Sequence, residues 1–446
     1  MTRVEKAYKI GDTEVFKQNI LCWAQQFEEI VWLDSNQYNQ EYSSFDAILA
    51  VDGLTSIKTD FNNAFEDLKE YQAITKDWIF GYLTYDLKND IEKLHSKNYD
   101  NLSFPDLFFF QPKKIIKLKK TEILFSYLAM VDDEIEEDYN EINKLNNSNL
   151  NCEDDTLKNS VLSNQETVKI KLRIHKDEYH AKVNKILEHI HRGDIYEVNF
   201  CQEFYALNTE INPVETYNKL NSISKPPFAT FLKVDDKYLL SASPERYLRK
   251  EGKQIISQPI KGTAKRAVTK KEDDLLKLSL ENDPKERSEN IMIVDLVRND
   301  LSKIALKGSV YIHELCKVYT FEQVHQMIST VEAEVHDETN PIEIIKSTFP
   351  MGSMTGAPKI SAMKIIEELE ETKRGLYSGA VGYFTPKGDF DFNVIIRSIL
   401  YNESEKYVSY SVGGAITSKS VPEKEYEECL IKAKAMRQVL EGKIND

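Results

Sequence analysis

The sequence predicts an α+β fold, in which a long series of strands is interrupted by a few helices. Short apolar runs bounded by turn residues recur through the 446 residues, whereas helical apolar spacing is confined to a few segments. The regular strand–helix alternation of a parallel α/β sheet is missing. The strand-like runs are 30–33, 45–51, 107–110, 114–118, 122–129, 198–205, 229–234, 238–241, 254–258, 376–384, 392–401 and 407–412.

Three segments are predicted to be helices. In the first, apolar residues recur at helical spacing, Asp177 is suited to cap the N-terminus, and Gly193 is placed to end the helix. The other two are 285–297 and 422–440. A fourth amphipathic helix should follow the small-residue loop at 351–359.

A shift in composition divides the chain into three parts. Residues 1–131 form an N-terminal region, and residues 166–446 form the region that carries the motifs described below. Between them, residues 132–165 are acidic and rich in asparagine with few bulky apolar side chains. This composition predicts a partly helical, partly mobile connection on the surface.

Charge and cysteine usage exclude several classes of protein. The net charge is −15 and no stretch is strongly basic, so nucleic acid is not an expected partner. No run of about eighteen apolar residues exists, and the N-terminus does not resemble a signal peptide, so no membrane association is expected. The five cysteines are scattered without a CxxC pair, which argues against a disulfide framework or a zinc site. A cytoplasmic enzyme or binding protein is the expectation.

Lys261 is the residue that suggests covalent chemistry. Apolar residues and a Gln-Pro pair precede it in 255–260, and Gly262 and Thr263 follow it, which predicts an extended segment running into a tight turn. A lysine desolvated in such a place loses part of its preference for the charged form and can act as a nucleophile. The alternative is an ordinary surface lysine beside a turn.

Two predicted helices each carry a pair of carboxylates three residues apart. Glu286 and Glu289 form one pair, and Glu425 and Glu428 form the other. A spacing of three places both members of a pair on one helix face. If the two faces meet, four carboxylates converge and need a cation, for which Mg²⁺ is suited. The alternative is that both pairs lie on ordinary solvated helix faces.

Two glycine-rich segments and two cationic residues are further candidates. The loop at 351–359 would present backbone N–H groups to an anion, and 412–416 would let a carboxylate approach the backbone. Arg397 lies on a presumed apolar strand and would bind either a substrate carboxylate or a structural acid. His325 is either a core histidine with satisfied hydrogen bonds or a catalytic group.

Taken together, these segments resemble the chorismate-utilising enzymes over about residues 176–437. The resemblance rests on six segments in the family's order, and two N-terminal segments also fit. The six are 193–199 (GDIYEVN), 243–246 (SPER), 259–263 (PIKGT), 289–301 (ENIMIVDLVRNDL), 352–359 (GSMTGAPK) and 420–432; the N-terminal two are 32–35 (WLDS) and 80–86 (FGYLTYD).

The resemblance implies both a fold and a reaction. The fold would be that of anthranilate synthase component I: two large antiparallel β-sheets form a β-sandwich with helices outside, and the N- and C-terminal portions are interwoven. Anthranilate- and isochorismate-forming members carry alanine where Lys261 stands. Lysine there is typical of the aminodeoxychorismate synthase branch, which leads to para-aminobenzoate and folate. In that branch the lysine attacks the ring of chorismate, and ammonia then displaces the lysine.

The resemblance also implies roles for individual residues. Glu245 matches the general acid that protonates the departing hydroxyl. Glu289 and Glu428 would bind Mg²⁺ directly, and Glu286 and Glu425 would hold metal-bound waters. The metal would bind the ring carboxylate of the substrate. The implied substrate-binding residues are His325, Thr355, Tyr377, Arg397, Gly413, Gly414, Ala415 and Lys432.

Two positions depart from the family pattern. Glu197 stands where amine-transferring members usually have glutamine and isochorismate-forming members have a lysine that activates water. This carboxylate would act as a base or would pair with a cation such as Lys261. Ala415 replaces a usual glycine, which changes the approach of its N–H if the position needs a positive φ.

The resemblance leaves partners and alternatives open. The chain has no Gly-x-Cys-x-Gly nucleophile, so ammonia would come from a glutamine amidotransferase partner or from solution. No lyase module is appended, so another enzyme would complete para-aminobenzoate. The alternatives are anthranilate synthase component I, against which Lys261 argues, and a non-catalytic chorismate-binding subunit. Near Ser35, tryptophan would be bound, regulatory or absent.

Overall fold

The computed structural model describes residues 2–38, 42, 45–145, 168–322 and 324–442. Within them, twenty strands are hydrogen-bonded into one sheet, in which neighbouring strands are antiparallel. The strands are β1 (Arg3–Lys9), β2 (Glu29–Asp34), β3 (Ala47–Thr59), β4 (Ile79–Leu83), β5 (Leu107–Lys119), β6 (Glu122–Leu128), β7 (Lys171–Leu172), β8 (Glu197–Ala206), β9 (Phe228–Val234), β10 (Lys237–Ser243), β11 (Arg246–Glu251), β12 (Gln254–Gln258), β13 (Ile260–Lys265), β14 (Tyr311–Thr320), β15 (Val324–Glu334), β16 (Gly356–Ala357), β17 (Ala380–Phe384), β18 (Phe390–Val394), β19 (Ser398–Asn402) and β20 (Tyr407–Thr417).

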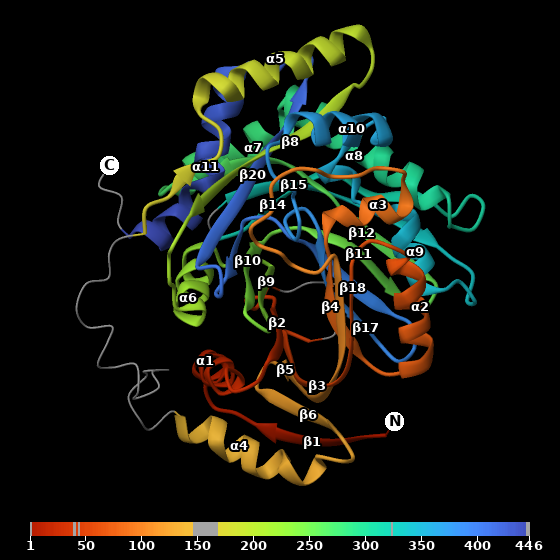
Figure 1. The fold of residues 1–446 in the computed structure, drawn as a ribbon, viewed down its shortest axis with the longest axis vertical. Coiled ribbons are helices and arrows are strands. Elements are labelled where there is room, and N and C mark those ends of the chain that lie inside the picture. Colours follow the sequence, from red (N-terminus) through yellow and green to blue (C-terminus); the bar gives the residue numbers. More distant parts are fainter. Residues whose placement is uncertain (1, 39–41, 43–44, 146–167, 323, 443–446) are drawn as a thin grey trace.

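Helices surround this sheet (Figure 1). The short 3₁₀ helices are η1 (Tyr85–Leu87), η2 (Asp132–Glu134) and η4 (Gly352–Met354). The α-helices are α1 (Thr13–Ala24), α2 (Ala64–Thr75), α3 (Lys88–Ile91), α4 (Ile135–Lys144), α5 (Lys176–Arg192), α6 (Pro213–Ser224), α7 (Lys270–Asn282), α8 (Pro284–Ser302), α9 (Pro341–Thr348), α10 (Lys359–Leu369) and α11 (Pro422–Glu441). The predicted α+β class is therefore confirmed.

The expectation of two separate sheets is wrong for the described residues. One limb of the sheet runs β8–β20–β19–β10–β9–β2–β3, and the other runs β4–β17–β18–β11–β12–β15. Strand β5 joins them, because it pairs with β3 along its length and with β4 through residues 107–110. Its later residues, 114–119, pair with β6. Strand β5, with 13 residues, is thus long enough to pair with strands of both limbs.

The predicted helices are present with different ends. Helix α8 begins earlier than predicted because Asp283 caps it, accepting hydrogen bonds from two backbone N–H groups, with Pro284 in the first turn. Helix α5 is capped at His175, and Asp177 lies in its first turn, so the predicted cap is wrong by two residues. Gly193 ends α5 with φ +85°, as predicted.

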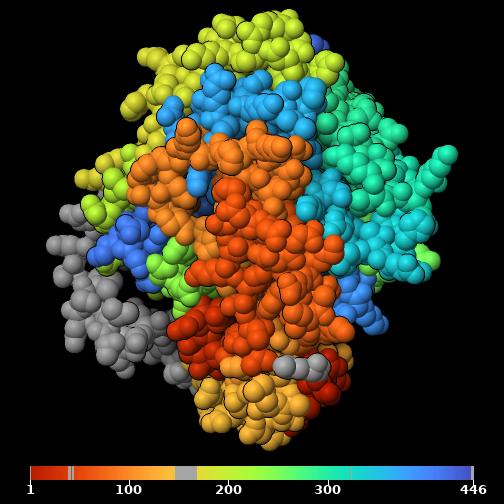
Figure 2. Space-filling model, turned by 45° about the vertical axis from the view of Figure 1, so that its right-hand side comes forward, coloured from red at the N-terminus to blue at the C-terminus, as the bar shows by residue number. Residues whose placement is uncertain are grey.

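The N- and C-terminal parts of the chain are interwoven. Strand β2 pairs with β9, and β4 pairs with β17. Figure 2 shows the orange N-terminal segment directly against light-blue residues far along the chain. There Tyr99 forms a bridge with Thr372, and the Asn98 side chain donates to the carbonyl of Glu370 at 2.9 Å. Of the predicted connection, η2 and α4 are helical, and 146–165 lies outside the described residues.

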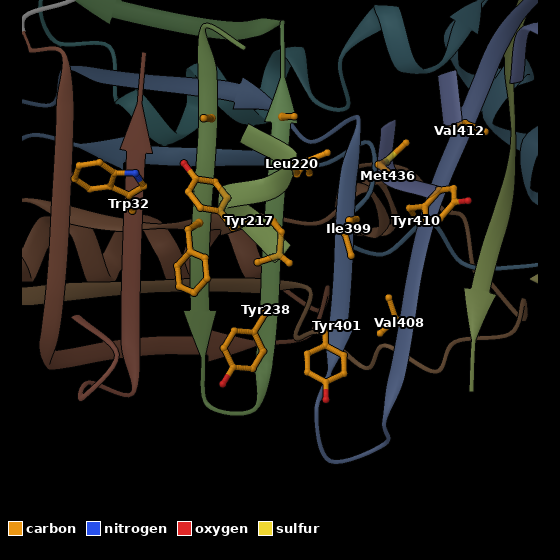
Figure 3. Packing of buried hydrophobic residues seen from close by; sticks show 14 of the residues in the cluster. Trp32, Tyr217, Leu220, Tyr238, Ile399, Tyr401, Val408, Tyr410, Val412 and Met436 are labelled. Carbon is orange, nitrogen blue, oxygen red and sulfur yellow. The ribbon is translucent and has the colours of Figure 1, made fainter. Parts of the chain in front are cut away.

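Alternation along the strands divides the buried apolar residues between two main clusters. In β3, Leu49 belongs to one cluster and Ala50 to the other, as the period of two requires. Helices α1, α4, α5, α6, α10 and α11 cover the first cluster, and both limbs of the sheet contribute to the second. Figure 3 shows strand side chains of the first cluster beside Tyr217 and Leu220 of α6.

Two features bear on the predicted compartment. In the part of the chain that the structure describes, no helix combines the length and apolar character needed to cross a membrane. Cys201, Cys316 and Cys429 are buried free thiols.

Truncating a side chain in the first cluster should measurably destabilise the fold. Ile399 in β19 is fully buried, and Ile399→Ala should cost about 2–5 kcal/mol because it removes apolar contacts and leaves a cavity. Ile74 in α2 is 73% exposed, so Ile74→Ala should change the free energy of unfolding by no more than about 0.5 kcal/mol. Urea denaturation of both variants tests this; equal losses would contradict the packing described.

Candidate active site

Lys261 lies on β13, where the strand departs from regular pairing with β15. The register shifts between Ile260 and Thr263, and Gly262 has φ +95°. The predicted extended segment is therefore present, with a bulge in place of the predicted tight turn. The side chain of Lys261 is only 14% exposed, and its Nζ lies 3.5 Å from Oε1 of Glu197.

The charge state of Lys261 is set by competition between burial and nearby carboxylates. Burial lowers the pKa of the Lys261 amine, but the carboxylates of Glu197, Glu289, Glu245 and Glu428 raise it by a larger amount. The net pKa lies above its ordinary value. Burial by itself thus favours the neutral amine, as expected, but the facing carboxylates outweigh it, and Lys261 forms an ion pair with Glu197.

Glu197, the first residue of β8, provides the nearest of these acids. Its side chain is 1% exposed, and burial raises the pKa of its carboxyl while Lys261 opposes that rise. Strand β8 is paired on both sides at this residue, with Ala357 in β16 and Thr417 in β20. Among the described residues, Oε2 of Glu197 has no hydrogen-bond partner. The carboxylate is rigidly placed and has unused acceptor capacity.

Glu245 connects β10 to β11 and is almost completely buried. Its Oε1 accepts a hydrogen bond from Oγ of Ser353 at 2.7 Å. Burial raises the pKa of the Glu245 carboxyl to about 7, although Ser353, Lys261 and Arg397 each favour the ionised form. A large share of Glu245 is therefore protonated near neutral pH, which is the state that a proton donor requires.

Arg397 lies in a break between β18 and β19, where the sequence predicted one continuous strand. Its backbone has φ +51°, which ends the extended run. Burial lowers the pKa of its guanidinium while Glu245 raises it. No carboxylate of the described residues forms an ion pair with Arg397 at 4 Å or less. The guanidinium remains open to an anion, which argues against the structural salt bridge.

The two carboxylate pairs approach one another from α8 and α11. A Cβ built on Gly414 would lie 3.5 Å from Oε2 of Glu425 and 3.8 Å from Oε1 of Glu428, so β20 passes close to the α11 pair. The Lys285 ammonium interacts electrostatically with Glu289, Glu425, Glu286 and Glu428. It lies 3.7 Å from Oε1 of Glu289. The four acids therefore share one electrostatic environment.

The burial of these acids differs in its effect on their protonation. Burial raises the pKa of Glu289 to about 7 and also raises the pKa values of Glu286 and Glu425. Burial acts in the same direction on Glu428, but the Lys432 ammonium at 2.7 Å holds its pKa below the ordinary value. An added cation would offset the repulsion between these carboxylates.

The donor set suits a hard divalent cation without forming a closed cage. Over residues 2–38, 42, 45–145, 168–322 and 324–442, no three acidic, histidine or cysteine side chains stand close enough to hold a metal ion. Oε1 of Glu289 is nevertheless buried without a hydrogen-bond partner among those residues. Mg²⁺ binds through one or two carboxylates and retains waters, so this open arrangement fits it.

The predicted carboxylate loop is part of strand β20. Gly413, Gly414 and Ala415 pair with β8 in regular antiparallel register, so the expectation that they follow a strand is wrong. A Cβ on Gly413 would lie 2.4 Å from Sγ of Cys201, which explains the glycine. Ala415 is not among the positive-φ residues, so its side chain brings no strain.

In three other predicted substrate-binding residues, the polar side-chain atoms contact other residues of the protein. Both ring nitrogens of His325 are 3.0 Å from partners, Asp273 and Thr320, which agrees with the core-histidine interpretation. The hydroxyl of Thr355 donates to backbone carbonyls in its own 3₁₀ turn. The buried hydroxyl of Tyr377 lies 3.5 Å from Sγ of Cys201, beside β8.

Ser35, the predicted tryptophan-site residue, follows β2 far along the sheet from Lys261. It is 8% exposed, and its Oγ has no hydrogen-bond partner among the described residues. The neighbouring Asp34 forms a buried ion pair with Lys17 at 2.8 Å. A polar, buried region is present, and the choice between bound, regulatory and absent tryptophan stays open.

Two residues that shape the site were not predicted from the sequence. Ser353 lies inside the segment 352–359, but only the fold shows that its hydroxyl reaches Glu245. Arg374 is buried and donates to the backbone carbonyls of Asn199 at 2.7 Å and Met354 at 2.6 Å, while pairing with Glu370. Nothing in its local sequence signals this contact between β8 and the loop at 352–355.

The fold and the site define an antiparallel α+β enzyme-like protein whose binding region combines buried acids with an open arginine. Residues 28–438 match the family model described as chorismate binding enzyme, so the chain belongs to that family.

Relatives with two different names resemble the chain to a similar degree. It is 32% identical over 400 residues to aminodeoxychorismate synthase component 1 of Bacillus subtilis, covering 86% of this chain and 80% of the relative. It is 33% identical over 370 residues to anthranilate synthase component 1 of Acetivibrio thermocellus, covering 81% and 74%. A probable aminodeoxychorismate synthase of rice is 40% identical over 269 residues, which span 60% of this chain and 30% of the rice protein.

Solved structures support the expected fold. The crystal structure of anthranilate synthase component I from Streptococcus pneumoniae matches with a TM-score of 0.74 and 26% identity, covering 90% of this chain and 94% of that one. The menaquinone-specific isochorismate synthase of Escherichia coli matches with a TM-score of 0.72 at 15% identity, covering 98% and 95%. At that identity the second likeness concerns the fold alone.

The close contact at Gly413 can be tested by adding a methyl group. Gly413→Ala should destabilise the protein by about 1–3 kcal/mol, because the new Cβ would overlap Sγ of Cys201 and approach the carbonyl of Phe200 at 2.8 Å. Ala415→Gly on the same strand adds no atoms and serves as the control. Thermal denaturation compares them; a Gly413→Ala protein as stable as the parent would contradict this packing.

Proposed function

We propose that the chain converts chorismate and ammonia to 4-amino-4-deoxychorismate, as the synthase component of an aminodeoxychorismate synthase. The observation that carries the proposal is the placement of Lys261, a buried amine facing the proton donor Glu245 and the acids of the cation region. Anthranilate-forming relatives need no amine at this position, because ammonia adds directly to the ring. Lys261 therefore favours the aminodeoxychorismate reaction over anthranilate formation.

In the proposed reaction the protein's own residues divide the displacement into two steps. The neutral amine of Lys261 attacks the 2-position of the ring, the double bond shifts, and the 4-hydroxyl leaves as water with the proton of Glu245. Ammonia then adds at the 4-position, the double bond returns, and the lysine nitrogen leaves. The ammonium group formed at the 4-position returns a proton to Glu245. No electrons are gained or lost, and Lys261 is regenerated.

Substrate orientation would come from groups on both sides of Lys261. Arg397 is a cation without an ion-pair partner among the described residues, so it would bind one carboxylate of chorismate. Glu289 and Glu428, with Glu286 and Glu425 behind them, would hold Mg²⁺. When bound, that ion would neutralise the ring carboxylate and offset the repulsion between the acids. Tyr377, Lys432, Gly413, Gly414 and Ala415 would line this region.

The ammonia supply is suggested by the relatives named component 1, a name that implies a second component. A glutamine amidotransferase partner would deliver ammonia, and a high concentration of ammonium would replace it in vitro. The proposed function implies this partner. The partner would supply the nitrogen and would not take part in the chemistry at Lys261.

Product identification tests the proposed function. The purified chain, supplied with chorismate, Mg²⁺ and an ammonium salt at mildly alkaline pH, should form aminodeoxychorismate without releasing pyruvate. Mass spectrometry identifies the product, and fluorescence detects anthranilate. Anthranilate with pyruvate would assign the chain to the tryptophan branch. Chorismate binding without turnover, with an active amidotransferase partner also present, would support the non-catalytic alternative.

Removal of the lysine amine should abolish most of this turnover. Lys261→Ala should lower the rate of aminodeoxychorismate formation by at least about 10²-fold, because the covalent route is lost. Lys265→Ala, on the exposed end of the same strand, should keep the parental rate. Product formation is followed by chromatography; an unchanged rate in Lys261→Ala would remove the nucleophile role.

The proposed metal ligands predict altered Mg²⁺ binding. Glu289→Gln and Glu428→Gln should each weaken binding by about tenfold or more, because a carboxylate ligand is replaced by a neutral amide. Glu427→Gln changes an exposed neighbour on α11 and should bind Mg²⁺ as the parent does. Calorimetric titration measures all three; parental affinity in both ligand variants would exclude these residues from the metal site.

A further inference from the structure

The position of Glu197 raises the question of how Lys261 becomes nucleophilic. An ammonium has no lone pair, so the proposed attack requires a group that accepts a proton from Nζ. The facing groups that carry charge are Glu197, Glu289, Glu245 and Glu428. Of these, only Glu197 forms an ion-pair contact with Lys261 at 4 Å or less among the described residues, at 3.5 Å.

The other acids are committed elsewhere. Glu245 accepts a hydrogen bond from Ser353 and must keep its own proton for the departing hydroxyl. Glu428 is paired with Lys432, and Glu289 with Lys285. Glu197 alone combines contact with the amine, nearly complete burial and an oxygen that has no hydrogen-bond partner in the described parts of the chain.

We propose that Glu197 is the catalytic base that takes a proton from the Lys261 ammonium before the amine attacks the ring. This inference rests on the proposed function and deepens it. One proton moves from Nζ of Lys261 to Oε1 of Glu197, which leaves a neutral amine and a neutral carboxyl group. When ammonia later displaces the lysine, the departing nitrogen recovers that proton, and Glu197 is again a carboxylate.

The environment supports this transfer. Burial disfavours charge on both partners, so an ammonium–carboxylate pair without water costs more than the same pair in solvent, and the neutral pair costs less. Burial raises the pKa of the Glu197 carboxyl, which favours its protonated form. The fixed backbone of β8 between β16 and β20 keeps the acceptor in place while the amine moves toward the ring.

A simple counter-ion role makes the opposite prediction for one substitution. If Glu197 only holds the ammonium in place, then Glu197→Gln should ease deprotonation of Lys261 and leave the rate unchanged or higher. If Glu197 is the base, the same variant should lower kcat by about 10²-fold or more, because its side chain no longer accepts the proton of Lys261. This loss is expected even though the free amine of Lys261 is no harder to form in the variant than in the parent.

The experiment therefore measures both turnover and amine reactivity in Glu197→Gln. Its kcat with chorismate, Mg²⁺ and ammonium should fall by about 10²-fold. In the same variant, acylation of Lys261 by an amine-directed reagent, followed by peptide mass spectrometry, should be as fast as in the parent or faster. A parental or higher kcat would overturn the proposal, as would parallel losses of kcat and acylation.

A conservative variant and a second lysine variant complete the design. Glu197→Asp keeps a carboxylate on a shorter side chain and should recover part of the lost kcat; a rate no higher than that of Glu197→Gln, in a protein with parental thermal stability, would argue against a base. Lys261→Ala is assayed in parallel. If it forms the product at the parental rate, the covalent route itself fails, and that failure is distinguishable from failure of the Glu197 proposal.

Discussion

The arrangement of the site depends on the burial of one cation, the Lys261 ammonium. A charged amine removed from water is strongly destabilised unless acids face it, so β13 can carry Lys261 only where β8, α8 and α11 bring carboxylates close. These acids repel one another and require the lysine, Lys285, Lys432 or an added cation. The same electrostatic requirement thus explains both the surroundings of the proposed nucleophile, Lys261, and the proposed affinity for Mg²⁺.

The scaffold holds these groups through contacts between segments that are distant in sequence. Arg374 links the backbone of β8 to the loop at 352–355, and Ser353 in that loop contacts Glu245. Glu370 joins the same cluster by accepting from the N–H of Cys201. A buried guanidinium with several partners is costly to disturb, so it fixes the acid and the strand that carries Glu197 in one geometry.

Short sequence patterns predicted those features of the structure that depend on residues close together in the chain. Helices α8 and α11 are evident from apolar spacing, and Gly193 ends α5 because glycine tolerates a positive φ. The break at Arg397 was not predictable, since apolar neighbours conceal a single residue with φ +51°. The role of β5 in joining the two limbs, and the contact between Ser353 and Glu245, arise from tertiary pairing that no short segment shows.

The most direct test of the covalent role of Lys261 is trapping of the lysine adduct. The protein is mixed with chorismate and Mg²⁺ without ammonia, quenched in acid, digested, and examined by mass spectrometry. The account predicts that the peptide containing Lys261 gains the mass of chorismate less one water, and that added ammonia removes this adduct. An unmodified Lys261 in protein that turns over chorismate when ammonia is supplied would contradict it.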